Sequence, residues 1–152
     1  MIRRTLMLAA LFALATPASA EPPPDWAVAV FPSGAEFSLE IAATPGQRRI
    51  GYMYREEIPA SAGMLFLFDS TERHGIWMKN CRVPLDIIWL DKSFRVTEIF
   101  ADAAPCPADG ACPSMEPMQT ADYVLEVAAG RAAEEKLRPG DLIVIHAEPP
   151  LR

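Results

Sequence analysis

Alternating and continuous hydrophobic segments along the chain predict a β-rich protein. In Glu36–Ala42 apolar side chains recur at every second residue, which is typical of a strand with one buried face. Met64–Phe68 is apolar throughout, which indicates a strand buried on both faces. Further short strand-like segments lie at 75–78, 85–90, 94–101, 123–128 and 142–147.

Two short helices are expected between these strands. The first spans 45–54, because Thr44 can serve as N-cap, Pro45 as the first helical residue and Gln47 as the third. The second spans 130–137 and ends before Pro139-Gly140. No helix is long enough to connect parallel strands as βαβ crossovers do. We therefore expect a β-rich α+β fold: a mostly antiparallel curved sheet or barrel with two short helices.

The first twenty residues resemble a secretory signal peptide. Arg3 and Arg4 form a basic start, residues 6–15 form a short apolar run, and Ala18-Ser19-Ala20 fits signal peptidase. The run is about half the length of a membrane span, which disfavours an anchor. A lipid anchor is also not expected, because there is no cysteine at the cleavage point. We expect cleavage after Ala20 and a periplasmic or secreted product. The paired arginines leave twin-arginine export open beside the general secretory route.

The remaining chain is short enough for one domain only. Residues 21–35 are expected to form an extended, Pro-rich lead-in, since they begin with the sequence EPPPD. Residues 36–147 then form the globular domain, and 148–152 a tail. No other apolar stretch reaches the length of a membrane span, so none is expected after cleavage.

The charge of the chain excludes some partners. Its 14 basic and 20 acidic residues give a net charge of −6, and cleavage of the leader would remove two of the arginines. The basic residues are scattered, with Arg48-Arg49 as the longest run after the leader. Nucleic acids and anionic membrane surfaces both require clustered positive charge, so we expect neither as a partner. We expect a monomer without a cofactor, whose partner is an unidentified small molecule or protein.

Three cysteines follow the leader. Cys106 and Cys112 enclose a short Pro-rich loop, and in an oxidising compartment they are expected to form a disulfide. Closing such a loop stabilises the fold by about 2.4 kcal/mol through the lost entropy of the unfolded chain. A redox or metal pair is the alternative, although such pairs favour Cys-x2-Cys spacing. Cys81 is left over, either buried or chemically available.

Candidate chemistry is densest between residues 63 and 90. Lys79, Asn80 and Asp86 lie in or beside a strongly apolar stretch, where polar groups need partners. The chain lacks the nucleophile elbow, the zinc-binding helix motif and the phosphate-binding glycine loop. A Cys81–His74 dyad is conceivable only if the two side chains meet in space.

The methionines allow a separate hypothesis. Thioether sulfur is a preferred ligand of Cu(I), and Met115 and Met118 have ligand-like spacing beside the Pro-rich loop. The other methionines lie mostly in apolar segments, where Met usually fills gaps in a core. Copper binding is therefore an alternative function, with metal ligands otherwise not expected.

Taken together, several motifs make the chain similar to a family known as domain of unknown function 192. They are GYMYRE (51–56), GMLFLF (63–68), WMKNC (77–81), PLDIIWLD (84–91), YVLEVAAG (123–130) and PGD (139–141), in the family order over about residues 36–147. The family usually has Thr at the position of Cys81, so the resemblance does not imply a required thiol, and Ile76 replaces the usual aromatic. The resemblance implies a compact β-rich domain, often exported, without an established activity.

The resemblance also selects the positions at which a site is expected. Among the matching positions, glycines and Pro84 suit turns and close packing. The polar members and their aromatic neighbour are the ligand-binding candidates: Arg55, Trp77, Lys79, Asn80, Asp86 and Glu126.

Three functions remain open from the sequence. The first is a small-ligand or protein-binding module in which Arg55 and Lys79 attract a carboxylate or another small anion. The second is a periplasmic enzyme with Asp86 as base and Lys79 as electrostatic stabiliser. The third is a copper-binding protein. A purely structural role, in which the charged residues pair with one another, is the alternative to all three.

Overall fold

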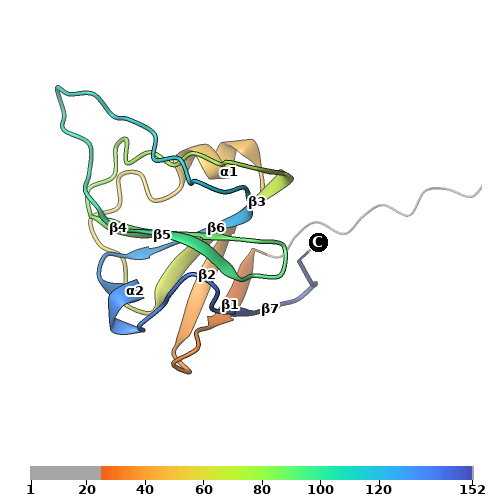
Figure 1. The fold of residues 1–152 in the computed structure, drawn as a ribbon. Helices are drawn as coiled ribbons and strands as arrows, with labels where there is room; N and C mark the ends of the chain where they lie inside the picture. The colour runs from red at the N-terminus through yellow and green to blue at the C-terminus, as the bar shows by residue number, and fades with distance from the viewer. Residues whose placement is uncertain (1–24, 152) are drawn as a thin grey trace, which may run out of the picture.

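The computed structural model describes residues 25–151 and shows one seven-stranded sheet with two short helices (Figure 1). The order of strands across the sheet is β5-β4-β6-β3-β2-β1-β7. The predicted signal peptide, the start of the predicted lead-in and Arg152 lie outside the described residues. The elements are β1 (Trp26–Val30), β2 (Glu36–Ala42), α1 (Pro45–Ile50), β3 (Ala62–Glu72), β4 (Leu85–Leu90), β5 (Val96–Ala103), β6 (Ala121–Ala128), α2 (Arg131–Glu134) and β7 (Val144–Ala147).

The sheet is mostly antiparallel, as predicted. Its one parallel pair is β2 with β3, and α1 lies in the connection between them. The expected segments 85–90 and 94–101 pair as the β4–β5 hairpin, and β6 pairs with both β3 and β4. These pairings place β6 near the middle of the sheet, with neighbours on both sides.

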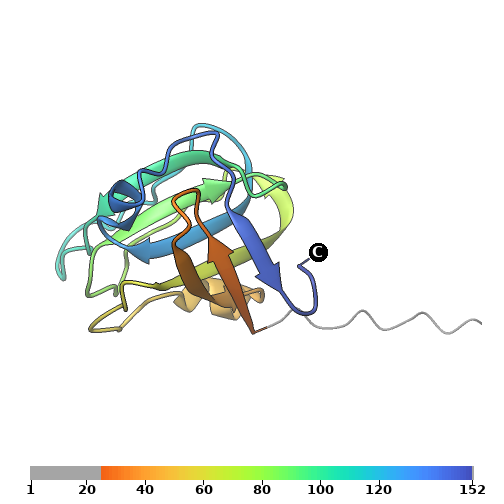
Figure 2. The same ribbon diagram turned by 90° about the horizontal axis from the view of Figure 1, so that it is seen from below.

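The sheet is strongly curled but does not close into a barrel (Figure 2). An isolated bridge joins Arg95 to Leu142, just before β5 and β7 begin, and the Val96 amide donates to the Asp141 carbonyl at 2.8 Å. The edge strands β5 and β7 themselves are not neighbours. The barrel alternative is therefore wrong, because the four residues of β7 pair only with β1.

Both faces of the sheet are buried. One face contacts a core to which β1, β2 and α2 contribute, with Phe37, Leu39, Leu125 and Ile143 almost fully buried. The opposite face is covered by α1 and by the connections before β4 and β6, and it holds Tyr52, Phe66, Ile87 and Trp89. Alternate residues of β4 enter the two cores, which explains why all six of its residues are buried.

Three sequence expectations need correction. Part of the predicted lead-in is strand β1, whose Ala27 and Ala29 are buried in the first core, so the domain begins before residue 36. The expected strand at 75–78 is reduced to one bridge between Ile76 and Met115. The first helix stops at Ile50, because Gly51 adopts a positive φ of 48°.

Within residues 25–151, no helix is long and apolar enough to cross a membrane.

Candidate ligand-binding site

A cavity of about 230 Å³ lies between α1 and the face of the sheet that α1 covers. We call it the α1 cavity. Its walls are residues 48–53, Phe66 and Phe68 of β3, residues 75–77, Cys81 and Glu126 of β6. The capping box fixes α1 above it: the Thr44 hydroxyl accepts from the Gln47 amide at 3.2 Å, and the Gln47 side chain accepts from the Thr44 amide at 2.9 Å.

Gly51 follows α1 and brings the backbone close to the carboxyl group of Glu126, which lines the cavity. A Cβ atom there would lie 3.1 Å from the Phe66 ring and 3.7 Å from Glu126 Oε2. The positive φ at this position also disfavours residues other than glycine. Glycine therefore allows the backbone to close over the carboxyl group.

Glu126 is the buried acid of the α1 cavity. The register of the sheet aligns Glu40, Met64 and Glu126 across β2, β3 and β6, so their side chains share the face that α1 covers. Only 5% of the Glu126 surface is exposed. Burial raises the pKa of its carboxyl to about 8, so the group is mostly neutral at neutral pH.

Tyr52 brings a second buried polar group to the cavity. Its hydroxyl has no hydrogen-bond partner within the described part of the chain. Burial and the negative charges of Glu40 and Glu126 raise the pKa of this phenol. The hydroxyl therefore stays protonated and is able to donate as well as accept.

Arg55 does not face the cavity as a free cation. Its guanidinium donates to both carboxylate oxygens of Glu40, at 2.5 and 2.6 Å, and lies 4.8 Å from the centre of the Tyr52 ring. The hydrogen bond to Glu40 raises the pKa of Arg55. This bidentate ion pair neutralises the positive charge of Arg55, which we expected from the sequence to attract an anionic ligand.

The two arginines of α1, which the sequence marked only as a basic run, differ in their surroundings. Arg48 is held in place by hydrogen bonds to the carbonyls of Ala43 and Leu67, and it lies 5.3 Å from the centre of the Phe68 ring. Arg49 is exposed and has no ion pair among residues 25–151. Arg49 is therefore the available positive charge beside the cavity.

The side chains of the WMKNC motif (77–81) line two different cavities. Trp77 lines the α1 cavity and is 42% exposed, with Lys79 Nζ 5.3 Å from its ring centre. Lys79 and Asn80 instead line a second cavity of about 360 Å³, which we call the disulfide cavity. Its other walls are Tyr54, Cys81, Arg82 and the loop around Cys106 and Cys112.

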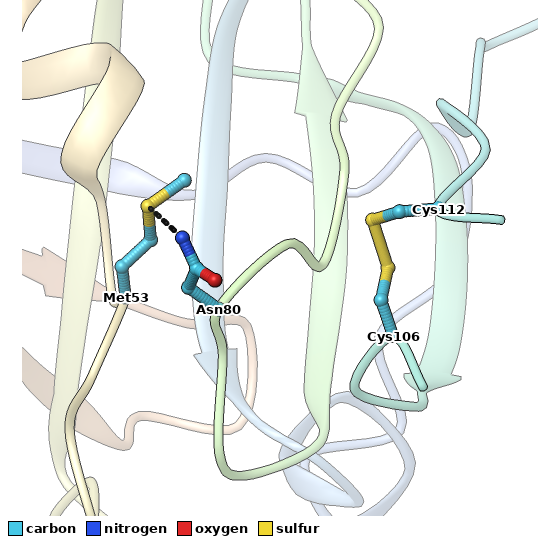
Figure 3. The surroundings of a disulfide bond; sticks show 4 residues. All are labelled: Met53, Asn80, Cys106 and Cys112. Carbon is cyan, nitrogen blue, oxygen red and sulfur yellow. Dashed lines mark hydrogen bonds between the residues drawn. A yellow bond between two sulfur atoms is a disulfide. The ribbon is translucent and has the colours of Figure 1, made fainter. Parts of the chain in front are cut away.

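Asn80 ties the segment before β4 to the segment after α1. Its amide nitrogen donates to Tyr54 Oη at 2.8 Å and points to Met53 Sδ at 3.8 Å (Figure 3). The Tyr54 amide returns a bond to the Asn80 carbonyl at 2.8 Å. Both residues have positive φ, 65° and 58°, which these bonds help to hold.

Asp86 is fully buried and far from the role of an open base. One carboxylate oxygen accepts from the Asp102 amide at 2.9 Å, and the other from the Ala132 amide at 2.8 Å. Asp86 therefore joins β4 to β5 and to the first turn of α2. It lines neither cavity, so the structure does not bring Asp86 and Lys79 together as the enzyme hypothesis requires.

Two of the three cysteines are paired as expected, and the third is free. Cys106 and Cys112 form the predicted disulfide, with their Cα atoms 5.3 Å apart. Cys81 is a half-buried free thiol that lines both cavities, and burial together with Glu126 raises its pKa to about 11. His74 stacks on Phe68, and its ring contacts the Ser70 carbonyl at 2.9 Å.

The methionine pair of the copper hypothesis lies outside both cavities. Met115 exchanges backbone hydrogen bonds with Ile76, whereas Met118 is 80% exposed. Across the described residues, no group of three or more His, Cys, Asp or Glu side chains could hold a metal ion. Copper binding by the two thioethers stays a prediction.

Two solved structures are similar to this fold. A protein from Sinorhizobium meliloti 1021, provisionally described as a transcription regulator, shares 29% identity with a TM-score of 0.70, over 82% of this chain and 97% of its own. A protein of unknown function from Novosphingobium aromaticivorans DSM 12444 shares 29% identity with a TM-score of 0.70, over 88% and 99%. No curated protein matches the chain.

The family assignment rests on most of the chain. Residues 28–145 match the DUF192 family, described as an uncharacterized ACR. The matched range begins within β1, ends within β7 and includes all six predicted site residues. The resemblance seen in the motifs is thereby confirmed, and the chain belongs to the DUF192 family.

Proposed function

We propose that this protein binds a small organic carboxylate in the α1 cavity. The observation that carries the proposal is one cavity that holds two buried polar groups: the Tyr52 hydroxyl, which has no hydrogen-bond partner within residues 25–151, and the Glu126 carboxyl. Buried polar groups normally find a partner, and a ligand would supply one. Apolar walls with a few convergent polar groups are typical of small-molecule sites.

Charge favours an acid over an amine as the ligand. Glu126 is mostly neutral below pH 8, so it offers a donor and no strong negative charge. Arg49 adds an unpaired positive charge next to the cavity. An amine would have to compete with the protein's own cations, which already lie over three aromatic rings of the wall: Arg48 over Phe68, Arg55 over Tyr52 and Lys79 over Trp77.

The ligand would then span the cavity from its mouth to Glu126. Its carboxylate would pair with Arg49, and its apolar body would pack against Phe66, Ile76 and Trp77. A polar atom at the far end would reach Tyr52 or Glu126. This arrangement keeps the carboxylate class expected from the sequence and assigns the pairing to Arg49 in place of Arg55 and Lys79.

An NMR titration of amide shifts tests the proposal with two probes of similar size and opposite charge. Phenylacetate is expected to shift the amides of α1 and of β6 around Glu126, whereas phenethylamine is not. Arg49→Gln should weaken phenylacetate binding roughly tenfold, as expected for one charge-assisted contact. Arg138→Gln, an exposed arginine after α2, is the matched control and should bind as the parent does. Preferential binding of the amine would contradict the proposal.

The same titration has an expected pH dependence. Above pH 8 Glu126 ionises and repels an anionic ligand, so affinity for phenylacetate should fall between pH 7 and 9. Glu126→Gln stays neutral and should hold its affinity over this range. An identical decline in the variant would remove Glu126 from the site.

We also infer that the protein works outside the cytoplasm. The pattern of residues 1–20 and the Cys106–Cys112 disulfide support export. Denaturing mass spectrometry of protein from the periplasm should give a chain that begins at Glu21. Retention of the uncleaved chain in the cytoplasm would contradict this.

The provisional description of the Sinorhizobium protein is not carried over. DNA binding depends on clustered Lys and Arg, and this chain has a net charge of −6 with scattered basic residues.

A further inference from the structure

The three cysteines lie around one cavity. Cys81, Cys106 and Cys112 all line the disulfide cavity, and all three are partly buried. Cys81 and Cys106 also pack against the same hydrophobic core. A free thiol and a disulfide therefore line the same cavity.

The backbone brings Cys81 close to one of the two bonded cysteines. The amides of Cys81 and Cys106 both donate to the Met78 carbonyl, at 3.2 and 3.3 Å. Their nitrogens are consequently within about 6.5 Å of each other. Each Cα atom lies about 1.46 Å from its nitrogen, so the two Cα atoms are within about 9.4 Å of each other. Disulfides join residues whose Cα atoms are usually about 4.4–6.8 Å apart, so bridging this pair requires the loop to move by at most a few ångström.

The loop that carries the disulfide can accommodate such an adjustment. Between β5 and β6, residues 104–120 contain no helix or strand, and their one regular backbone pairing is the bridge between Ile76 and Met115. Figure 3 shows the Cys106–Cys112 bond on this loop, beside the segment that carries Asn80. Cys106 is held near Cys81 by the Met78 carbonyl, while Cys112 has no such backbone contact within residues 25–151.

We propose that the three cysteines form a thiol–disulfide exchange site in which Cys81 displaces Cys112 from Cys106. The Cys81 thiol gives its proton to a base in solution, and its sulfur attacks Cys106 Sγ. The Cys106–Cys112 bond breaks, a Cys81–Cys106 bond forms, and the electron pair leaves on Cys112 Sγ, which takes up a proton. The exchange needs no oxidant, and it leaves a thiol on the exposed loop that can react with a thiol or disulfide of another molecule.

The environment of Cys81 makes this exchange slow at rest. Because burial and Glu126 raise its pKa to about 11, roughly one molecule in ten thousand carries the thiolate at pH 7. The rate should rise about tenfold for each pH unit until the thiolate predominates. Above pH 8, where Glu126 is ionised, Glu126→Gln removes the nearby negative charge and should accelerate exchange.

Disulfide mapping of variants in which one of the three cysteines is replaced tests the pairing. Full-length Cys112→Ser is equilibrated in a buffer of reduced and oxidised glutathione, alkylated and analysed by intact mass and peptide mapping. Loss of both free thiols through a Cys81–Cys106 bond is expected. Cys106→Ser is the matched control and should keep Cys81 and Cys112 mostly free. Persistent free thiols in Cys112→Ser, or equal bridging in both variants, would overturn the proposal.

A measurement on the unmodified protein covers the case in which a variant does not fold. The protein is held at pH 8.5 with a trace of reduced glutathione, and its free thiol is alkylated at intervals. The label is expected to move in part from Cys81 to Cys112. A label that stays on Cys81 alone at equilibrium would overturn the proposal independently of any substitution.

Discussion

A single acidic residue determines the character of the α1 cavity. Glu126 lies on a central strand where the alternation of side chains points it away from the first core and towards Tyr52 and Cys81. Its motif marked it as a polar member of the family pattern, but the sequence could not tell that it would be neutral. That property comes from burial under α1, whose residues lie 76 to 81 positions earlier in the chain.

The ionisation of Glu126 should appear in the stability of the protein. Its pKa is about 8 in the folded state and 4.5 in the unfolded state, so folding favours the protonated form. The associated stabilisation is complete below pH 4.5 and is lost as the pH rises to 8, by roughly 5 kcal/mol in total. Urea denaturation at several pH values should show this decline in the parent and not in Glu126→Gln. Glu36→Gln, an exposed control on β2, should behave as the parent does.

Elements that are defined by local signals agree with the sequence analysis. The Thr44–Gln47 capping box begins α1 where predicted, and β4 coincides with the expected segment 85–90. The expected strand at 75–78 fails for a tertiary reason. Ile76 and Met78 are buried, yet they cover the sheet as part of a connection, and a hydrophobic pattern does not distinguish a covering segment from a strand.

The role of Asp86 was also not predictable from local sequence, because its partners lie on two other elements. An acid inside LDIIWL is unusual, and we interpreted it from the sequence as a candidate base. The structure uses both of its oxygens to hold backbone amides of β5 and α2. Nothing local to the motif specifies that partnership, because Ala132 is 46 residues away.

Replacing Asp86 should therefore affect folding. Asp86→Ala leaves the Ala132 and Asp102 amides without an acceptor and should reduce the free energy of unfolding by about 2–4 kcal/mol, with Asp86→Asn between it and the parent. Asp109→Ala, in the exposed loop, should change it by less than about 0.5 kcal/mol. Urea denaturation measures all three. A stable Asp86→Ala protein that fails to bind phenylacetate would restore the functional interpretation.

At the scale of the whole molecule, the site depends on the sheet having two covered faces. The sequence indicated this through the continuous apolar segment of β3, and it predicted the mostly antiparallel curved sheet. The cavity was not predictable, since its wall combines α1, β3, β6 and residues 75–81. Only the register of three strands aligns Glu40 with Glu126.

Hydrogen exchange should separate the interior of this sheet from its margin. Amides of β4 and β6 are flanked by strands on both sides and buried on both faces, so they should exchange only through global unfolding. Amides of β7 and of the 104–120 loop should exchange by local opening. Exchange followed by NMR or mass spectrometry would contradict this if β7 were as protected as β6.

The pairing of β1 with β7 has a kinetic consequence. The first strand of the described chain lies between β2 and the last strand, which is more than a hundred residues away. Such a fold has a high contact order, and folding on the millisecond-to-second scale is typical of β-rich proteins of this kind. A growing or partly translocated polypeptide can form its hairpins, yet it leaves one edge of β1 unpaired until the C-terminal residues emerge. During that interval the exposed edge is open to intermolecular strand addition.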